Sequence, residues 1–172
     1  SLISFNINQL ATKIMQINFS EFSLPKTGAL VVLAVNKKLT KKAAEIDAKS
    51  GGAITKAMKA AGFEGKKDEM IRILNHALPV EQVILAAVEV DKKHPEKTLK
   101  ALGGNIYSYV NRHKIKNASI LLEDLGVKEF SLEEVACKIA FGAKLKSYTF
   151  DKYFYETNDY GHQAHRDISA YW

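Results

Sequence analysis

Cysteine is almost absent from the sequence, in which Cys137 is the one cysteine among 172 residues. No disulfide can therefore form within the chain, and we expect a reducing compartment. Cys137 lies in EEVACKIAFGAKL, a stretch with helical periodicity. A structural thiol is far commoner in such a stretch than a nucleophile, so we expect this side chain to be buried.

Long hydrophobic runs are absent as well. No apolar run approaches the roughly 20 residues needed to cross a bilayer, so we expect no membrane partner. The N-terminal stretch SLISFNINQLATKIMQINF lacks the basic-then-apolar order of a secretory signal, and Lys13 interrupts it. Together with the scarcity of cysteine, these features favour a cytoplasmic location.

The common catalytic and nucleotide-binding motifs are missing. The sequence contains no P-loop, GxGxxG, HExxH or GxSxG motif and no paired cysteines. His162 and His165 in HQAH, flanked by Asp159 and Asp167, could together hold a metal ion. No strong apolar helix orients this pair, so we favour a polar linker there and expect no metal site in this chain.

Basic residues outnumber acidic ones, 25 to 19, which gives a formal net charge of +6 and a pI of about 9.2. This excess makes contact with DNA or another polyanion possible. The candidate nucleic-acid contacts are paired lysines, namely Lys37, Lys38, Lys41, Lys42, Lys66 and Lys67. Lysines spread in this way are also typical of a solvated surface, which is the alternative that we favour.

Apolar patterning predicts strands that alternate with helices. The expected strands cover residues 13–19, 29–35, 68–74, 81–90 and 118–123. The expected helices cover residues 40–50, 53–61, 95–113 and 131–147. The strands at 29–35, 81–90 and 118–123 are continuous apolar runs, which is typical of strands buried on both faces. We therefore predict an α/β fold, a three-layer α/β/α sandwich with a mixed, largely parallel sheet. One domain is expected over residues 1–155, followed by a linker or tail over 156–172.

Local signals define the ends of the predicted helices. Thr40 is a possible N-cap for the first helix, and Gly62 should end the second. Pro95 should occupy the first turn of the third, and Ser131 with Glu134 forms a capping box for the fourth. The fourth helix is expected to face inward with Leu132, Val135, Ile139 and Ala143.

A glycine pair gives the best candidate for a binding site. In SGGAITKAMKAAGF, Gly51 and Gly52 precede a helix that begins at Ala53. The free N–H groups of such a helix start can bind an anion such as a phosphate. The alternative is a plain helix–turn–helix corner, in which Gly51 supplies a left-handed cap and Gly52 the tight turn.

Several stretches in order resemble the N-terminal domain of the cytosolic leucyl aminopeptidase family. They are IDAKSGGAITKAMKAAGFEGKKDE, LPVEQVILAAV, LGGNIYSYV and FGAKLKSYTFDKY. The last resembles the way this domain ends in the family, with Ser147, Tyr148, Phe150, Asp151 and Tyr153 in the matching places. The resemblance covers about residues 29–153. It departs at Ala87-Val88-Glu89, where the family often has Gly-Leu-Gly, and it does not extend beyond Tyr155.

The resemblance implies a non-catalytic domain. In the family, two divalent metals, zinc or manganese, are held in a separate C-terminal catalytic domain by carboxylates and a lysine within an Asn-Thr-Asp-Ala-Glu-Gly-Arg signature. This sequence lacks that signature, so no catalytic residue, metal ligand or cofactor is expected in it. The expected partners are the catalytic domain and a homo-hexamer, with roles in assembly and substrate access. DNA binding in some bacterial members, and ADP-ribose binding by macrodomains of similar fold, leave alternatives at the lysines and at Gly51-Gly52.

Overall fold

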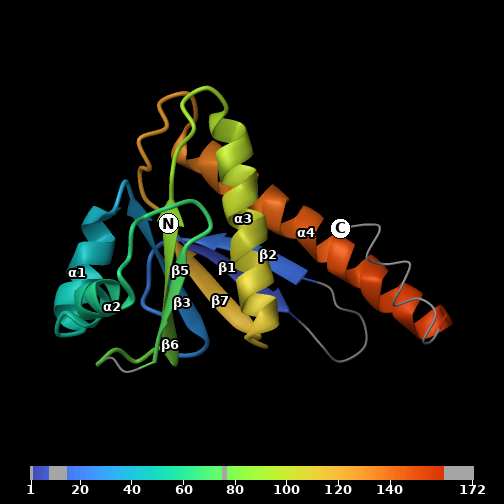
Figure 1. Cartoon of the computed structure of the whole chain (residues 1–172), viewed down its shortest axis with the longest axis horizontal. Coiled ribbons are helices and arrows are strands. Elements are labelled where there is room, and N and C mark those ends of the chain that lie inside the picture. The colour runs from blue at the N-terminus through green and yellow to red at the C-terminus, as the bar shows by residue number, and fades with distance from the viewer. Residues whose placement is uncertain (1, 8–14, 75–76, 161–172) are drawn as a thin grey trace.

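The computed structural model describes residues 2–7, 15–74 and 77–160. Within them a seven-stranded sheet has the order β2-β1-β7-β3-β6-β5, with the short β4 paired to β3 (Figure 1). The strands are β1 (Leu2–Ile7), β2 (Met15–Ser20), β3 (Ala29–Val35), β4 (Lys38–Leu39), β5 (Met70–Ile73), β6 (Gln82–Val88) and β7 (Asn117–Leu121). β3 pairs in parallel with β6 and β7, and the other pairs are antiparallel. The predicted mixed sheet is confirmed, with its parallel part at the centre.

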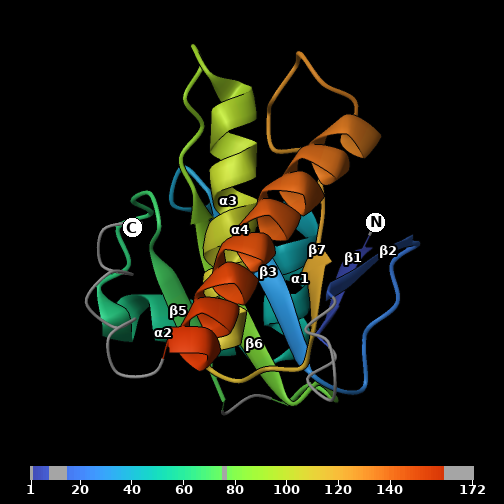
Figure 2. The same cartoon turned by 90° about the vertical axis from the view of Figure 1, so that its right-hand side faces the viewer.

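Helices cover both faces of the sheet. They are α1 (Lys41–Lys49), α2 (Ala53–Ala61), α3 (Pro95–Arg112) and α4 (Leu132–Tyr160). One buried cluster joins α1 and α2 to the sheet, and a second cluster joins α3 and α4 to its other face. Figures 1 and 2 show the pairs of helices on opposite sides, which confirms the predicted three-layer sandwich.

The central strands are buried on both faces, as their apolar sequences predicted. Along β3, Val31 and Leu33 pack toward α3 and α4, whereas Leu30 and Val32 pack toward α1 and α2. Successive side chains of a strand point to opposite faces, so a strand between two helical layers needs an apolar residue at every position. β6 is buried along its whole length for the same reason.

Two glycines allow α3 and α4 to cross at close range. A Cβ at Gly103 would overlap the carbonyl oxygen of Ile139, and one at Gly142 would overlap that of Lys100. Only hydrogen fits at these positions, so the two backbones lie in contact. Figure 2 shows α4 lying across α3 on this face of the sheet.

The first strand was not predicted. β1 lies between β2 and β7 and pairs with both in antiparallel register, and Ile3 is fully buried. Its sequence LISFNI alternates apolar and polar residues, so the signal was present. The expected strand at 13–19 is found as β2 (Met15–Ser20), and it forms an edge of the sheet as predicted.

The Thr40 side chain does not cap α1, contrary to the prediction. Thr40 stands at the N-cap position, but its hydroxyl makes no capping hydrogen bond. The N–H of Lys42 instead donates to both carboxylate oxygens of Glu123, at 2.9 and 3.0 Å. Glu123 follows β7 in the sequence, so this cap is supplied by a tertiary contact. A carboxylate at this position also complements the positive end of the helix dipole.

Two predictions about side chains of α4 are wrong. Cys137 is exposed, not buried. Leu132, expected to face inward, is 36% exposed because it lies in the first turn, where no earlier turn of the helix covers it. Val135, Ile139 and Ala143 are buried as predicted. Cys137 lies about 200° around the helix from Val135, which places it on the opposite face.

The backbone of α4 also runs beyond its predicted end. The helix continues past Ser147 and past the expected domain boundary at Tyr155, as far as Tyr160. The N-terminal cap is as predicted, since the N–H of Glu134 donates to Ser131 Oγ at 3.2 Å. In the part of the chain that the structure describes, each helix is too short or too polar to span a bilayer.

Candidate functional site

The glycine pair forms a sharp corner between α1 and α2. Gly51 and Gly52 both have left-handed backbones, with φ angles of 69° and 79°. No heavy atom lies within 4 Å of a Cβ built at either position. Glycine is therefore favoured here by backbone conformation and not by crowding. Gly62 ends α2 with φ of 63°, as predicted.

The N–H groups at the start of α2 are already hydrogen-bonded within the chain. Asp47 Oδ1 accepts from the N–H groups of Ile54 and Thr55, at 2.9 and 3.1 Å. The Thr55 hydroxyl donates to the other oxygen of Asp47. The N–H of Ala53 donates to Ser50 Oγ at 3.3 Å. An anion at this corner would have to displace a buried carboxylate, so the geometry favours the turn over the anion site.

The candidate lysines lie near the carboxyl ends of the central strands β3 and β6. Lys37 and Lys38 belong to the hairpin after β3, and Lys41 and Lys42 to the first turn of α1. Lys66 and Lys67 precede β5, which runs antiparallel to β6 and so begins at the end of the sheet where β6 finishes. The hairpin and this last turn pack together, because a Cβ at Gly65 would lie 3.0 Å from the Cα of Lys37.

Carboxylates are interspersed among these lysines. Lys66 forms an ion pair with Glu64, which lowers the pKa of the Glu64 carboxyl and raises the pKa of the Lys66 ammonium. Glu69 accepts from the N–H groups of Glu64 and Lys66, at 3.1 Å for each closest oxygen. Opposite charges therefore break up the basic surface along this turn. Contact between the lysines and nucleic acid stays a prediction.

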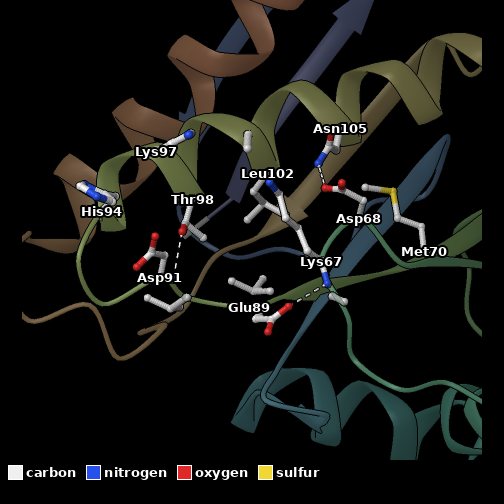
Figure 3. A pocket seen from close by; sticks show the side chains of 14 residues that line it. Lys67, Asp68, Met70, Glu89, Asp91, His94, Lys97, Thr98, Leu102 and Asn105 are labelled. Carbon is white, nitrogen blue, oxygen red and sulfur yellow. Dashed lines mark hydrogen bonds between the residues drawn. The ribbon is translucent and has the colours of Figure 1, made fainter.

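A cavity of about 390 Å³ lies beside this turn, at the carboxyl end of β6 (Figure 3). Its place follows from the topology. β3 leads into α1 on one face of the sheet, whereas its parallel neighbour β6 leads into α3 on the other. Two adjacent parallel strands whose connections leave in opposite directions open a crevice at their carboxyl ends, where ligands bind in open α/β sheets.

The cavity has an apolar floor and a charged rim. The floor includes Met70, Ala87, Val88 and Leu102 from β5, β6 and α3. The charged or polar side chains of the rim are Lys67, Asp68, Glu89, Asp91, His94, Lys97, Thr98 and Asn105. They come from the turn before β5, the loop after β6 and the N-terminal two-thirds of α3. These three segments enclose the cavity.

Hydrogen bonds hold the rim in place. The N–H of Asp91 donates to Thr98 Oγ1 at 3.1 Å, which ties the loop after β6 to α3. The N–H of Lys67 donates to Glu89 Oε2 at 3.1 Å. Asn105 Nδ2 donates to Asp68 and joins α3 to the turn before β5, as Figure 3 shows. These contacts link the three elements around the cavity.

Of the residues of this rim, only Lys67 was predicted from the sequence as a candidate contact. A usable signal was present, because Glu89 lies near the end of the strand predicted over residues 81–90, and Asp91 directly follows it. Polar residues at that point are expected to line the edge of a parallel sheet. Asp68 and Asn105 carry no comparable signal, since the fold alone brings the turn before β5 against α3.

The histidines do not form a common site in the described part of the chain. His94 and His113 lie at the two ends of α3. His76, His162 and His165 lie outside the described residues. A search of the described residues finds no group of His, Cys, Asp and Glu arranged to hold a metal ion.

Comparisons with known proteins identify a family. A model of the cytosol aminopeptidase family, N-terminal domain, matches residues 30–154. A probable cytosol aminopeptidase of Rickettsia bellii is 31% identical over 144 residues, which cover 81% of this chain and 28% of the relative. One from Ehrlichia ruminantium is 33% identical over 97 residues, covering 56% of this chain and 18% of the relative. One from Pseudomonas syringae pv. tomato is 30% identical over 105 residues, which cover 60% of this chain and 21% of the relative.

The molecule is thus an α/β/α sandwich with a crevice at the carboxyl ends of its central strands. The chain belongs to the cytosol aminopeptidase family and corresponds to the N-terminal domain of that family. It spans less than a third of the length of these curated relatives.

Proposed function

We propose that this chain is the non-catalytic N-terminal domain of a cytoplasmic, metal-dependent leucyl aminopeptidase. The full-length protein would remove N-terminal amino acids from peptides, with two zinc or manganese ions in a separate catalytic domain. The observation that carries the proposal is the family match over residues 30–154, together with the small share of each relative that the chain spans. The domain would support hexamer assembly and access of peptides to the catalytic domain.

An exposed apolar stripe on α4 supports a role in assembly. Phe141, Leu145 and Tyr148 are 53%, 55% and 59% exposed. Their spacing of four and three residues places them on one face of the helix, opposite the face that covers the sheet. Single exposed apolar residues are ordinary on a protein surface, but a contiguous row of large ones is typical of an interaction surface.

We propose the catalytic domain as the partner of this stripe. The family match ends at residue 154, inside α4 and shortly after Tyr148. In the longer relatives, the segment that follows this domain therefore begins close to the position of the stripe. A domain joined there is held at a high effective concentration, so a modest apolar contact is enough for docking.

Activity measurements test the catalytic part of the proposal. The isolated chain should hydrolyse no leucine anilide in the presence of manganese or zinc, whereas the full-length protein should hydrolyse it. Turnover by the purified isolated chain, retained after further purification, would show that this domain is itself catalytic.

Substitution of the stripe tests the docking role. In the full-length protein, Leu145→Lys should lower the assembled mass in analytical ultracentrifugation, together with the aminopeptidase activity. Leu74→Lys is the matched control, because Leu74 is 62% exposed and lies just after β5, outside α4. The isolated domain with Leu145→Lys should stay folded. Unchanged assembly and activity in full-length Leu145→Lys would contradict the docking role.

A further inference from the structure

The cavity beside β6 combines features that point to one kind of ligand. Its floor is apolar, and its rim carries three carboxylates, from Asp68, Glu89 and Asp91. The rim also carries the ammonium groups of Lys67 and Lys97. Among the described residues, neither of these ammonium groups forms an ion pair. Charges of both signs therefore surround a small apolar surface.

The charge balance argues against ions of a single sign. Three carboxylates and two ammonium groups give the rim a net charge of −1, which is close to zero. A phosphate or nucleotide would lie against the carboxylates, which repel it, and a metal cation would lie against the lysines. A ligand with separate positive and negative groups avoids both penalties.

The volume sets the size of the ligand. A cavity of about 390 Å³ lies near the lower end of the range, roughly 300 to 1,000 Å³, that is typical of small-molecule sites. The floor formed by Met70, Ala87, Val88 and Leu102 suits an aliphatic side chain, since burying one there removes apolar surface from water.

We propose that this cavity binds a free α-amino acid or a dipeptide with an apolar side chain. The ammonium group of the ligand is held by Asp91 with the other rim carboxylates, its carboxylate by Lys97 with Lys67, and its side chain by the floor. The hydrogen bond from the Asp91 N–H to Thr98 Oγ1 holds the backbone of the loop at Asp91 against α3, so the Asp91 carboxylate is kept at the cavity before the ligand arrives. This role goes beyond assembly, and binding to the isolated chain does not depend on the catalytic domain.

Titrations followed by ¹H–¹⁵N NMR test the proposal on the 172-residue chain. Leu-Leu dipeptide, added to about 20 mM, should shift the amide signals of residues 67–70, 87–91 and 97–105 and reach saturation in the millimolar range. N-acetyl-leucine amide has the same side chain but no charge, and should produce no saturating shifts there. Inorganic phosphate and ADP-ribose should also leave these signals in place.

Three variants sharpen the test. Lys97→Gln and Asp91→Asn should each weaken Leu-Leu binding at least about fivefold, because each removes one charged partner of the ligand. Lys92→Gln removes a charge from the same loop but not from the cavity, and should leave the affinity unchanged. Dispersed spectra for all three variants would show that they fold.

Several results would overturn the proposal. They are the absence of local shifts with Leu-Leu, equal shifts with the uncharged analogue, and equal affinity in Lys97→Gln, Asp91→Asn and the unsubstituted chain. Saturating shifts with phosphate or ADP-ribose but not with Leu-Leu would identify an anion site instead. None of these results bears on whether the full-length protein is an aminopeptidase, which the activity measurements decide.

Discussion

Asp47 determines how α1 passes into α2. Its side chain is 9% exposed and accepts hydrogen bonds from two backbone N–H groups and one hydroxyl of α2. An acidic residue usually caps a helix from the position just before it. Here the cap comes from the last turn of the previous helix, and the left-handed Gly51 and Gly52 turn the chain back so that it can reach.

Replacement of Asp47 tests this role. Asp47→Ala should lower the free energy of unfolding by about 2 kcal/mol, because it leaves the buried N–H of Ile54 and the partly buried N–H of Thr55 without an acceptor. Asp47→Asn keeps one carbonyl oxygen and should cost less. Glu45→Ala, at an exposed position of the same helix, should change stability by less than about 0.5 kcal/mol. Urea denaturation measures all three, and equal losses for Asp47→Ala and Glu45→Ala would exclude the cap.

His113 should make folding sensitive to mild acid. Burial, and then the positive charges of Arg72 and Arg112, hold the pKa of His113 below its ordinary value. The unfolded chain thus takes up this proton more readily than the folded chain does. Stability should fall as the pH drops from about 6.5 toward the lower folded pKa, with no contribution from this group above pH 7. His113→Gln should reduce the loss of stability between about pH 7 and pH 5, measured by urea denaturation. An unchanged slope would contradict this.

Of the two adjacent glycines in α3, only Gly103 lies so close to α4 that a side chain cannot fit. At Gly103 a Cβ would overlap the backbone of Ile139, whereas at Gly104 the nearest atom, the carbonyl oxygen of Gly142, is 3.6 Å away. Neighbouring positions on one helix therefore differ in what they tolerate. The sequence LGGNIYSYV shows both glycines, but it does not show which one faces α4.

Alanine substitutions at Gly103 and Gly104 should differ in their effect on stability. Gly103→Ala should lower the free energy of unfolding by about 3 kcal/mol, because the two backbones must move apart. Gly104→Ala should leave it unchanged or raise it by up to about 1 kcal/mol, since alanine is the better helix former. Thermal or urea unfolding followed by circular dichroism separates these cases. A similar loss for both variants would show that the helices do not cross at Gly103.

Both layers of the core share the same strands. Val31 and Leu33 of β3 serve one face while Leu30 and Val32 serve the other, so loss of either helical layer exposes a strand that the other layer needs. We therefore expect the isolated chain to unfold in a single cooperative step. Urea denaturation monitored by circular dichroism and by NMR amide signals from β3, α2 and α3 should give coincident midpoints. Loss of α1 and α2 signals well before those of α3 would contradict this expectation.

Local sequence patterns determined much of the architecture. Continuous apolar runs predicted β3 and β6, helical spacing predicted α2 and α3, and Gly62 and Pro95 marked helix ends at the residues where they occur. These features depend on side-chain period and on backbone conformation, which neighbouring residues set. The order of four short stretches likewise pointed to the family that the comparisons show.

Only the tertiary structure decided the contacts between distant segments. Glu123 caps α1, Asn105 meets Asp68 at the rim of the cavity, and Cys137 faces solvent with the apolar stripe of α4. No local pattern encodes these arrangements, because each depends on which helix covers which face of the sheet. The sequence alone thus determined most of the elements and the family. The folded chain determined the cap of α1, the exposed face of α4 and the cavity, since these arise where elements remote in sequence meet.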